Sequence, residues 1–247
     1  MKKRLLLHYR ADCNTNDIWR AAIQSGWSTD RIHDVIPEVA LTGVDRVRYY
    51  GNTLHASRIA DQLPFRFLPL DLTILSTTYL TKREVLLMKL SELPNYRDRP
   101  YFIKPAQEKW FPARVYGIDE VVTGGEEGKT GSLPDDLIYV QSVVHFINEV
   151  RCFCLDGKVH TASYYRVSGQ YHCSNLDEER PKVIDDMVTE LAPHYPRGVV
   201  LDFGYTEDGE WSFLEPNESF AAGIYSSCPM RCLEVIEASQ VDLIRSY

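Results

Sequence analysis

The sequence predicts an α/β protein with a small parallel layer at its N-terminus and antiparallel hairpins after it. In the first part of the chain, apolar strand-like runs alternate with segments of helical pattern, the order that gives a parallel sheet with crossover helices. Further along, apolar runs flank the dipeptides Asp156-Gly157 and Asp208-Gly209, which suit tight turns between antiparallel strands. Both patterns together indicate the α/β class.

Composition and charge exclude several classes of function. The chain has 247 residues, 44% hydrophobic and 25% charged, as in ordinary globular proteins. A formal charge of -8 argues against a nonspecific nucleic-acid binder, whose affinity depends on cations that neutralise phosphates. The apolar run at residues 5–7 is too short for a signal peptide or a membrane span. We therefore expect a cytoplasmic protein with no membrane partner.

The N-terminal elements are delimited by turn residues. Gly26 stops the first helical pattern, and Leu63-Pro64 ends the second. From these signals we expect strands over residues 4–9, 44–50 and 65–70, helices over residues 17–25 and 53–62, and a linker over residues 71–79.

The middle of the chain carries two local signals. Thr81 followed by Glu84 forms a capping-box pattern, which predicts a helix over residues 81–93 with Lys82 in its first turn. The apolar run of residues 101–105 predicts a strand.

The second half is predicted to contain strands, two helices and a surface loop. We expect the loop over residues 124–132, strands over residues 138–146, 149–155 and 159–166, and helices over residues 178–191 and 230–239. Alternation along the strand over 149–155 places Glu149 and Arg151 on one face. The simpler interpretation of that face is a partly exposed strand with its charges outward.

The last hairpin brings two carboxylates together. If Asp208-Gly209 forms a two-residue turn, Asp202 lies directly opposite Glu215. Asn217 lies two residues further and shares the face of Glu215. Cross-strand neighbours stand about 4.5–5.5 Å apart at Cβ, where like charges repel, so this pair needs a cation or a proton between its members.

The chemistry of this hairpin favours a metal ion. Asp202, Glu215 and Asn217 present oxygen atoms, the preferred ligands of Mg²⁺. The alternative is a solvated acidic edge. The neighbouring side chains are apolar, however, which raises the cost of unpaired charge. We therefore predict a magnesium site.

A family resemblance rests on these residues. The run LDFGYTEDGEWSFLEPNESFAAGIY resembles the closing segment of the ATP-grasp fold, in which an acidic residue on one strand and Glu-x-Asn on the next hold the magnesium ions of MgATP. By this resemblance, Asp202 matches the first ligand, Glu215 the bridging glutamate and Asn217 the asparagine.

The resemblance extends to cations that would hold phosphates. Lys104, at the end of its strand, resembles the ATP-grasp lysine that contacts the α- and β-phosphates. Lys82 is a second match, for the α-phosphate, with an exposed lysine as the alternative. The loop over the phosphates departs from the family because it lacks glycine. Lys109 and Arg114 are the candidates to replace its backbone N–H groups.

The nucleotide base and sugar sites are also implied by resemblance. Gln141, Val143 and Val144 lie on a run that resembles the hinge strand whose backbone reads the adenine edge. Glu149 resembles the glutamate that accepts the ribose hydroxyls. A guanidinium fork suits phosphate oxygens. The candidates to hold the γ-phosphate or an acyl phosphate are Arg151 and Arg166.

The resemblance implies three parts and an activity. The parts are an N-terminal α/β domain (residues 1–75), an ATP-grasp central lobe (76–136) and an ATP-grasp C-terminal lobe (137–247), with both lobes built on antiparallel sheets. The implied activity is carboxylate–amine ligation with ATP and Mg²⁺ through an acyl phosphate. The partners would be small-molecule or peptide carboxylates and amines, without nucleic acid. An ATP-dependent kinase and a nucleotide-binding module without turnover are the alternatives, and the oligomeric state, a homodimer included, stays open.

Overall fold

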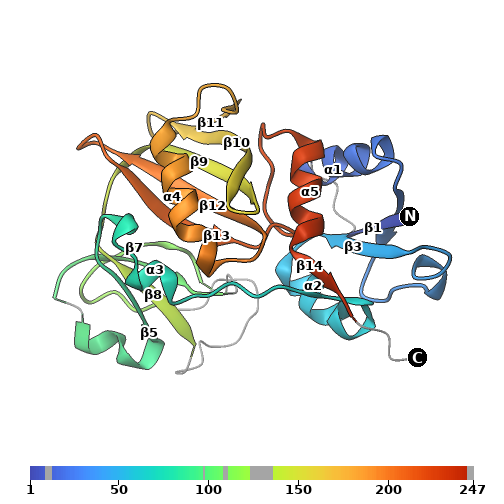
Figure 1. Ribbon diagram of the computed structural model, residues 1–247. Coiled ribbons are helices and arrows are strands. Elements are labelled where there is room, and N and C mark those ends of the chain that lie inside the picture. The colour runs from blue at the N-terminus through green and yellow to red at the C-terminus, as the bar shows by residue number, and fades with distance from the viewer. Residues whose placement is uncertain (9–12, 97, 108–110, 123–135, 244–247) are drawn as a thin grey trace.

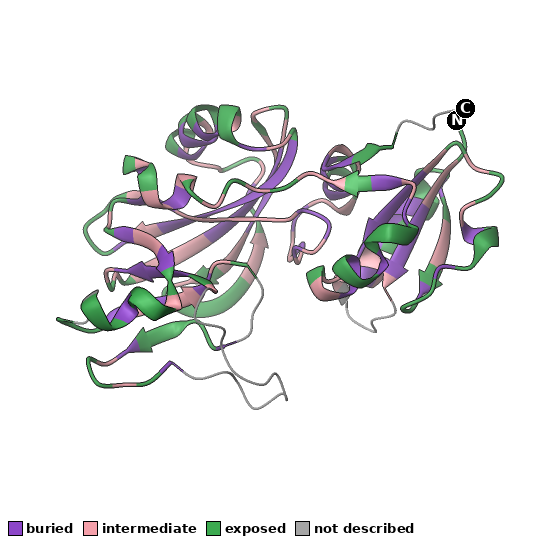
Figure 2. Cartoon of the chain, turned by 90° about the horizontal axis from the view of Figure 1, so that it is seen from below, coloured by how far each residue is buried: buried purple, intermediate pink, exposed green. Residues whose placement is uncertain are grey.

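The computed structural model places two lobes side by side (Figure 1). It describes residues 1–8, 13–96, 98–107, 111–122 and 136–243. The first and last described elements lie in the smaller lobe, and the other lobe contains the two larger sheets. Figure 2 shows that buried residues follow the strands of both lobes.

The N-terminal layer is a parallel sheet of order β2-β1-β3. Its strands are β1 (Lys3–His8), β2 (Ser28–Ile32) and β3 (Arg46–Tyr50), and its helices are α1 (Cys13–Gln24) and α2 (Thr53–Ile59). The predicted parallel layer is confirmed. The strand β2 was not predicted, because its sequence STDRI is mostly polar and carries no apolar alternation.

The last elements of the chain pack onto this first layer. α5 (Pro229–Ala238) contacts α1, and β14 (Gln240–Asp242) pairs antiparallel with β4 (Phe65–Phe67). The predicted strand over residues 65–70 is therefore shorter than expected and lies outside the parallel sheet. One core cluster combines apolar side chains from the two ends of the chain, among them Leu5, Leu6, Leu7, Ile18, Leu233 and Ile236.

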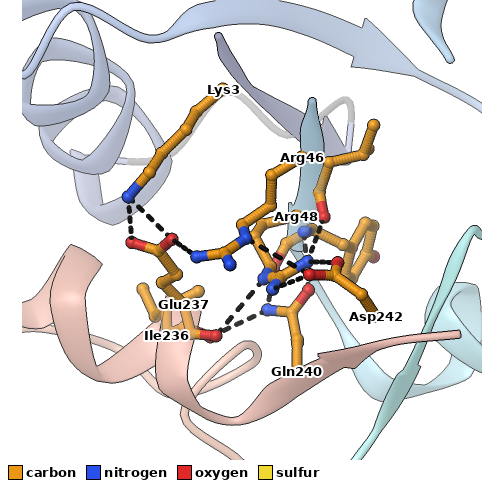
Figure 3. Close-up of polar contacts among 9 residues, drawn as sticks. Lys3, Arg46, Arg48, Ile236, Glu237, Gln240 and Asp242 are labelled. Atoms are coloured by element: carbon orange, nitrogen blue, oxygen red, sulfur yellow. Dashed lines mark hydrogen bonds and ion pairs between the residues drawn. The ribbon is translucent and has the colours of Figure 1, made fainter. Parts of the chain in front are cut away.

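A charged cluster ties this returning segment to the first layer (Figure 3). Glu237 on α5 is paired with Lys3 at 2.7 Å and with Arg46 at 2.8 Å. The guanidinium of Arg48 is 3% exposed and contacts Asp242 at 2.5 Å. Because these pairs join residues from opposite ends of the chain, they fix the position of α5 and β14.

A four-stranded antiparallel sheet of order β5-β8-β6-β7 begins the larger lobe. Its strands are β5 (Val85–Lys89), β6 (Tyr101–Pro105), β7 (Arg114–Tyr116) and β8 (Leu137–Gln141). The strand over 101–105 is confirmed, but the predicted helix over 81–93 is wrong. The apolar run Val-Leu-Leu-Met fits either state, and pairing with β8 makes it a strand with Val85 and Met88 buried. The expected loop over 124–132 lies outside the described residues.

A five-stranded antiparallel sheet of order β11-β10-β9-β12-β13 completes the lobe. Its strands are β9 (Phe146–Leu155), β10 (Lys158–Val167), β11 (Gln170–Asn175), β12 (Gly198–Thr206) and β13 (Trp211–Asn217). The predicted strand over residues 138–146 is interrupted, because β8 ends at Gln141 and β9 begins at Phe146. Residues 142–145 therefore connect the two antiparallel sheets.

Helical segments complete the described chain. α4 (Lys182–Leu191) packs on the five-stranded sheet through its buried apolar stripe, and it begins after Pro181 instead of at residue 178. α3 (Ile74–Thr77) is a single short helix, and 3-10 turns occupy Glu38–Ala40, Ala60–Gln62, Tyr79–Thr81, Leu90–Tyr96 and Ala192–His194. Among the helices that the structure describes, none has both the length and the apolar character needed to cross a bilayer.

Candidate active site

In the hairpin of β12 and β13, Asp202 pairs with Glu215 as predicted, but the loop and the register beside the loop differ from the prediction. The Thr206 N–H donates to the Glu210 carbonyl at 2.9 Å, so the loop contains one residue more than the predicted turn. Near the loop the pairing is therefore one residue out of the predicted register. A β-bulge beside Asp202, in which Leu214 is the extra residue, shifts the pairing by one residue and restores the predicted register.

The bulge decides which side chains face each other. Without it, Asp202 would lie opposite Leu214, and Glu215 would point to the other face of the sheet, since a slip of one residue reverses every side chain. With it, Asp202 and Glu215 are paired. Asn217 is on the same side, because its Nδ2 donates to Asp202 Oδ2 at 3.1 Å.

Asp202 is held by a buried arginine on the neighbouring strand. The two residues are paired across β12 and β9, and Arg151 donates from Nε to Oδ1 at 2.9 Å and from Nη2 to Oδ2 at 2.7 Å. Asp202 is 1% exposed. Burial raises the pKa of Asp202, and Arg151 opposes that rise. Burial alone would lower the pKa of Arg151, but Asp202 raises it above its ordinary value, so the guanidinium stays charged.

Lys104 joins the two antiparallel sheets at the hairpin. Its ammonium on β6 forms an ion pair with Glu215 on β13 and lies 5.3 Å from the centre of the Tyr139 ring. The Lys104 side chain is 14% exposed and that of Glu215 is 34% exposed. The structure thus supplies the cations that the carboxylate pair was expected to need, one for Asp202 and one for Glu215.

A third ion pair joins β10 to β9. Arg166 Nε approaches Glu149 Oε1 at 3.2 Å, and the Glu149 side chain is 17% exposed. Burial raises the pKa of Glu149, although a hydrogen bond from Tyr165 and the charge of Arg166 oppose the rise. Glu149 and Arg151 therefore bind different partners, and Arg166 is the more exposed of the two candidate arginines.

The loop after the hairpin contacts Arg151. The Arg151 guanidinium lies 5.1 Å from the ring centre of Tyr225, and its Nη1 donates to the Gly223 carbonyl at 3.3 Å. Asn14 of α1 holds the same loop, because its Oδ1 accepts from the backbone N–H groups of Ile224 at 2.9 Å and Tyr225 at 3.3 Å. The N-terminal layer therefore contributes directly to the surroundings of the site.

The remaining predicted site residues occupy different positions. Lys82 is exposed in a left-handed conformation, with its ammonium 5.8 Å from the Tyr79 ring centre. Val143 and Val144 lie on the connection between the two sheets, and Val143 is exposed. Arg114 forms an ion pair with Glu120 and is itself exposed. Lys109 lies outside the described residues.

Arg83 contacts the hairpin, although no sequence signal pointed to it. Its guanidinium donates to Gln141 Oε1 at 2.9 and 2.7 Å and to the carbonyls of Phe213 at 2.8 Å and Leu214 at 3.1 Å. Burial lowers the pKa of Arg83 to about 10. No sequence signal marked it, because the segment was predicted as a helix, where Arg83 would be an ordinary surface residue.

The donor set fits Mg²⁺. A carboxylate has about four lone-pair positions, so Asp202 and Glu215 retain acceptor capacity beside their cations. Asn217 donates through Nδ2, which leaves its Oδ1 available as a ligand. Among the described residues, no group of three or more His, Cys, Asp or Glu side chains could hold a metal. The groups that would hold the ion are thus the two carboxylates of Asp202 and Glu215 and the amide of Asn217.

Comparisons with known proteins agree with this architecture. The chain matches the model of a family described as "ATP-grasp domain, R2K clade family 2" over residues 80–235. Among solved structures, D-alanine–D-alanine ligase from Bacillus anthracis complexed with ATP has 13% identity and a TM-score of 0.59 over 97% of both chains. D-cycloserine synthetase DcsG has 12% identity and a TM-score of 0.54 over 95% of this chain and 98% of that one.

A third solved structure contains a bound precursor variant. The ATP-grasp ligase PsnB, complexed with a phosphomimetic variant of its minimal precursor, Mg and ADP, has 11% identity and a TM-score of 0.52 over 97% of this chain and 99% of that one. At such identities the likeness shows a shared fold. No curated protein sequence matches the chain.

Proposed function

Because this chain belongs to the ATP-grasp domain family, R2K clade family 2, we propose that it is an ATP- and Mg²⁺-dependent carboxylate–amine ligase. The observation that carries the proposal is the ion pair of Lys104 with Glu215, directly beside the Asp202–Arg151 pair. Cations and oxygen ligands from both antiparallel sheets meet there, which is the requirement for binding a triphosphate together with a metal ion.

The proposed reaction has two steps. A substrate carboxylate attacks the γ-phosphorus of ATP, and the bond to the departing ADP oxygen breaks, which gives an acyl phosphate. An amine nitrogen then attacks the acyl carbon, loses a proton and displaces phosphate to form an amide or peptide bond. The protein contributes positioning and charge stabilisation to both steps.

Each side chain would have a distinct part in this chemistry. Lys104 would move from Glu215 onto the α- and β-phosphates of bound ATP. Asp202, Glu215 and Asn217 would hold Mg²⁺, which neutralises charge on the transferring phosphoryl group when it is bound. Arg151 keeps Asp202 oriented.

The nucleotide contacts and the second arginine follow the same proposal. The connection between the two sheets, with Gln141, Val143 and Val144, would line the adenine pocket. Glu149 would accept the ribose hydroxyls after release from Arg166. That release would leave the exposed guanidinium of Arg166 to bind a phosphate or carboxylate oxygen.

The substrates would bind between the hairpin and the N-terminal layer. The loop over residues 219–227 contains small residues and is held from the N-terminal side by Asn14, while Arg151 contacts it from the hairpin side. Carboxylates and amines, free or at the end of a peptide, are the substrate classes that the proposed reaction requires.

A nucleotide-binding module without turnover is the second candidate. The observation that favours it is the segment after Lys104, which contains no glycine before Gly117 to let backbone N–H groups approach the phosphates closely. In that case ATP would bind without phosphoryl transfer.

The test measures ADP release by the purified protein with ATP and MgCl2, against pooled amino acids and small carboxylates. Glu215→Gln should abolish release and leave the fold intact, and Asp202→Asn should strongly reduce it. Glu207→Gln, an exposed carboxylate in the loop of the same hairpin, is the matched control and should behave as wild type.

The products separate the candidates. Phosphate and an amide formed together support the ligase, whereas a phosphorylated product without free phosphate indicates a kinase. A Mg²⁺-dependent rise in melting temperature with ATP, but no ADP with any pool, supports the binding module. Normal turnover by Glu215→Gln would show that the metal assignment is wrong.

A further inference from the structure

We propose that Arg83 is a positioning residue that fixes the β-bulge of β13 and thereby holds Glu215 opposite Asp202. Its role as a structural clamp stands independently of the proposed function. Its effect on turnover rests on that function.

Arg83 contacts the backbone of β13 at the edge of the five-stranded sheet. This strand is at the edge of the five-stranded sheet, so one side of its backbone has no neighbouring strand. The bulge at Leu214 also interrupts the ladder to β12. Arg83 meets this position directly, since its Nη1 donates to the Phe213 carbonyl at 2.8 Å and its Nη2 to the Leu214 carbonyl at 3.1 Å.

The guanidinium of Arg83 also contacts the four-stranded sheet. Nε and Nη2 donate to Gln141 Oε1 at 2.9 and 2.7 Å, and Nη1 donates to the Thr81 carbonyl at 3.0 Å. Ser212 adds a link, because it accepts from Arg83 at 3.2 Å and donates to the same Thr81 carbonyl. Arg83 therefore connects the bulge to the end of β8, in the four-stranded sheet.

These contacts require an arginine. A planar guanidinium has five N–H donors in a fixed fork and can bind acceptors on both edges at once. A lysine ammonium has three donors at one point and cannot reach the Gln141 amide and both bulge carbonyls together. Shape, more than charge, is what this position requires.

The consequence for the site follows from register. Glu215 is the residue directly after the bulge, and the bulge alone turns its side chain toward Asp202. Holding two successive carbonyls prevents the bulge from moving along the strand. Arg83 would thus act on the metal site through backbone geometry, without contacting ATP, substrate or metal.

The experiment compares Arg83→Met and Arg83→Lys with wild type and with Arg99→Met. Arg99 is an exposed arginine beside the four-stranded sheet, and it forms an ion pair with Glu84. Arg99→Met is therefore the matched control. Hydrogen–deuterium exchange is followed in the peptides that cover β13 and, as an internal reference, β9 and β10. No nucleotide is needed for this measurement.

We expect exchange at the amides of residues 213–215 to rise by at least about tenfold in Arg83→Met, with β9 and β10 unchanged. Arg83→Lys should show the same local rise, because it keeps the charge and loses the fork. If Arg83→Met fails to fold, Arg83→Lys decides the question. Unchanged exchange in β13, or an equal rise throughout the five-stranded sheet, would overturn the positioning role.

Turnover gives the second readout. Where wild type releases ADP, Arg83→Lys should lower kcat by about 10- to 100-fold with little change in the KM for ATP, since misplaced ligands slow chemistry more than binding. Full rescue of kcat by lysine would show that only charge matters and would overturn the proposal. If wild type releases no ADP, the ligase proposal fails, and the exchange experiment still decides the role of Arg83.

Discussion

Arg151 and Asp202 face each other across β9 and β12 and form two parallel hydrogen bonds of 2.9 and 2.7 Å in the interior of the five-stranded sheet. Removing one member of such a pair strongly destabilises the folded protein, because the remaining charge stays buried without a partner. The sequence predicted the correct strand for Arg151 but a phosphate group as its partner, whereas in the structure its guanidinium binds the Asp202 carboxylate.

Arg151→Met should lower the free energy of unfolding by about 3–5 kcal/mol, since it leaves Asp202 buried and unpaired. Adding Asp202→Leu should recover much of this loss. The control is Arg166→Met, because the Arg166 side chain is half exposed and its pair with Glu149 should contribute no more than about 1 kcal/mol. Urea denaturation measures all of these variants. Equal effects of Arg151→Met and Arg166→Met would contradict the expectation.

Lys104→Met should weaken the binding of MgATP by about 10- to 100-fold, because a charged contact to phosphate is lost. The measurement is the ATP concentration dependence of the melting temperature in the presence of Mg²⁺. Lys89→Met, an exposed lysine on β5 of the same sheet, is the control and should bind as wild type does. Undiminished binding by Lys104→Met would remove Lys104 from the phosphate site.

The charged cluster around α5 and β14 should make stability depend on pH (Figure 3). A hydrogen bond from Arg48 lowers the pKa of Asp242. Burial alone would raise the pKa of Glu237, but Lys3 and Arg46 lower it overall. A lowered folded-state pKa gives stability that is present above the ordinary carboxyl pKa of about 4 and is lost as the pH falls through the folded-state value.

The test compares wild type with Asp242→Asn between neutral pH and acid. At neutral pH the variant should melt at a lower temperature, because Arg48 loses its charged partner. The difference in melting temperature should shrink as the pH falls, since acid protonates Asp242 in wild type. A difference that stays constant down to the acid transition would show that the pair contributes no pH-dependent stability.

Gly198→Ala should destabilise the protein by about 1–3 kcal/mol through overpacking. A Cβ at Gly198 would lie 2.2 Å from the Val235 carbonyl oxygen and 2.8 Å from the Ser239 backbone nitrogen, so α5 would have to move. Gly117→Ala is the control, because the nearest atom to its added Cβ is 4.0 Å away. Urea midpoints for both variants measure the effect, and equal midpoints would show that α5 accommodates the methyl group.

Several features of this protein could be predicted from local sequence. Asp156-Gly157 and the strands around it formed the expected hairpin, and alternating elements gave the parallel layer. The predicted pairing of Asp202 with Glu215 was also correct. The extra residue in the loop shifts the register by one, and the extra residue in the bulge shifts it back. Periodicity and turn residues specify such elements because their determinants are close together in the chain.

The rest depended on contacts between distant residues. β5 is a strand because β8 supplies its hydrogen bonds, which outweighs the capping-box signal at Thr81. The bulge at Leu214 is bound by Arg83, whose position 131 residues away gives no local signal. The sequence by itself determined which chemical groups the hairpin carries. The tertiary structure decided which of them face one another, because a one-residue shift in register is set by long-range hydrogen bonds and burial.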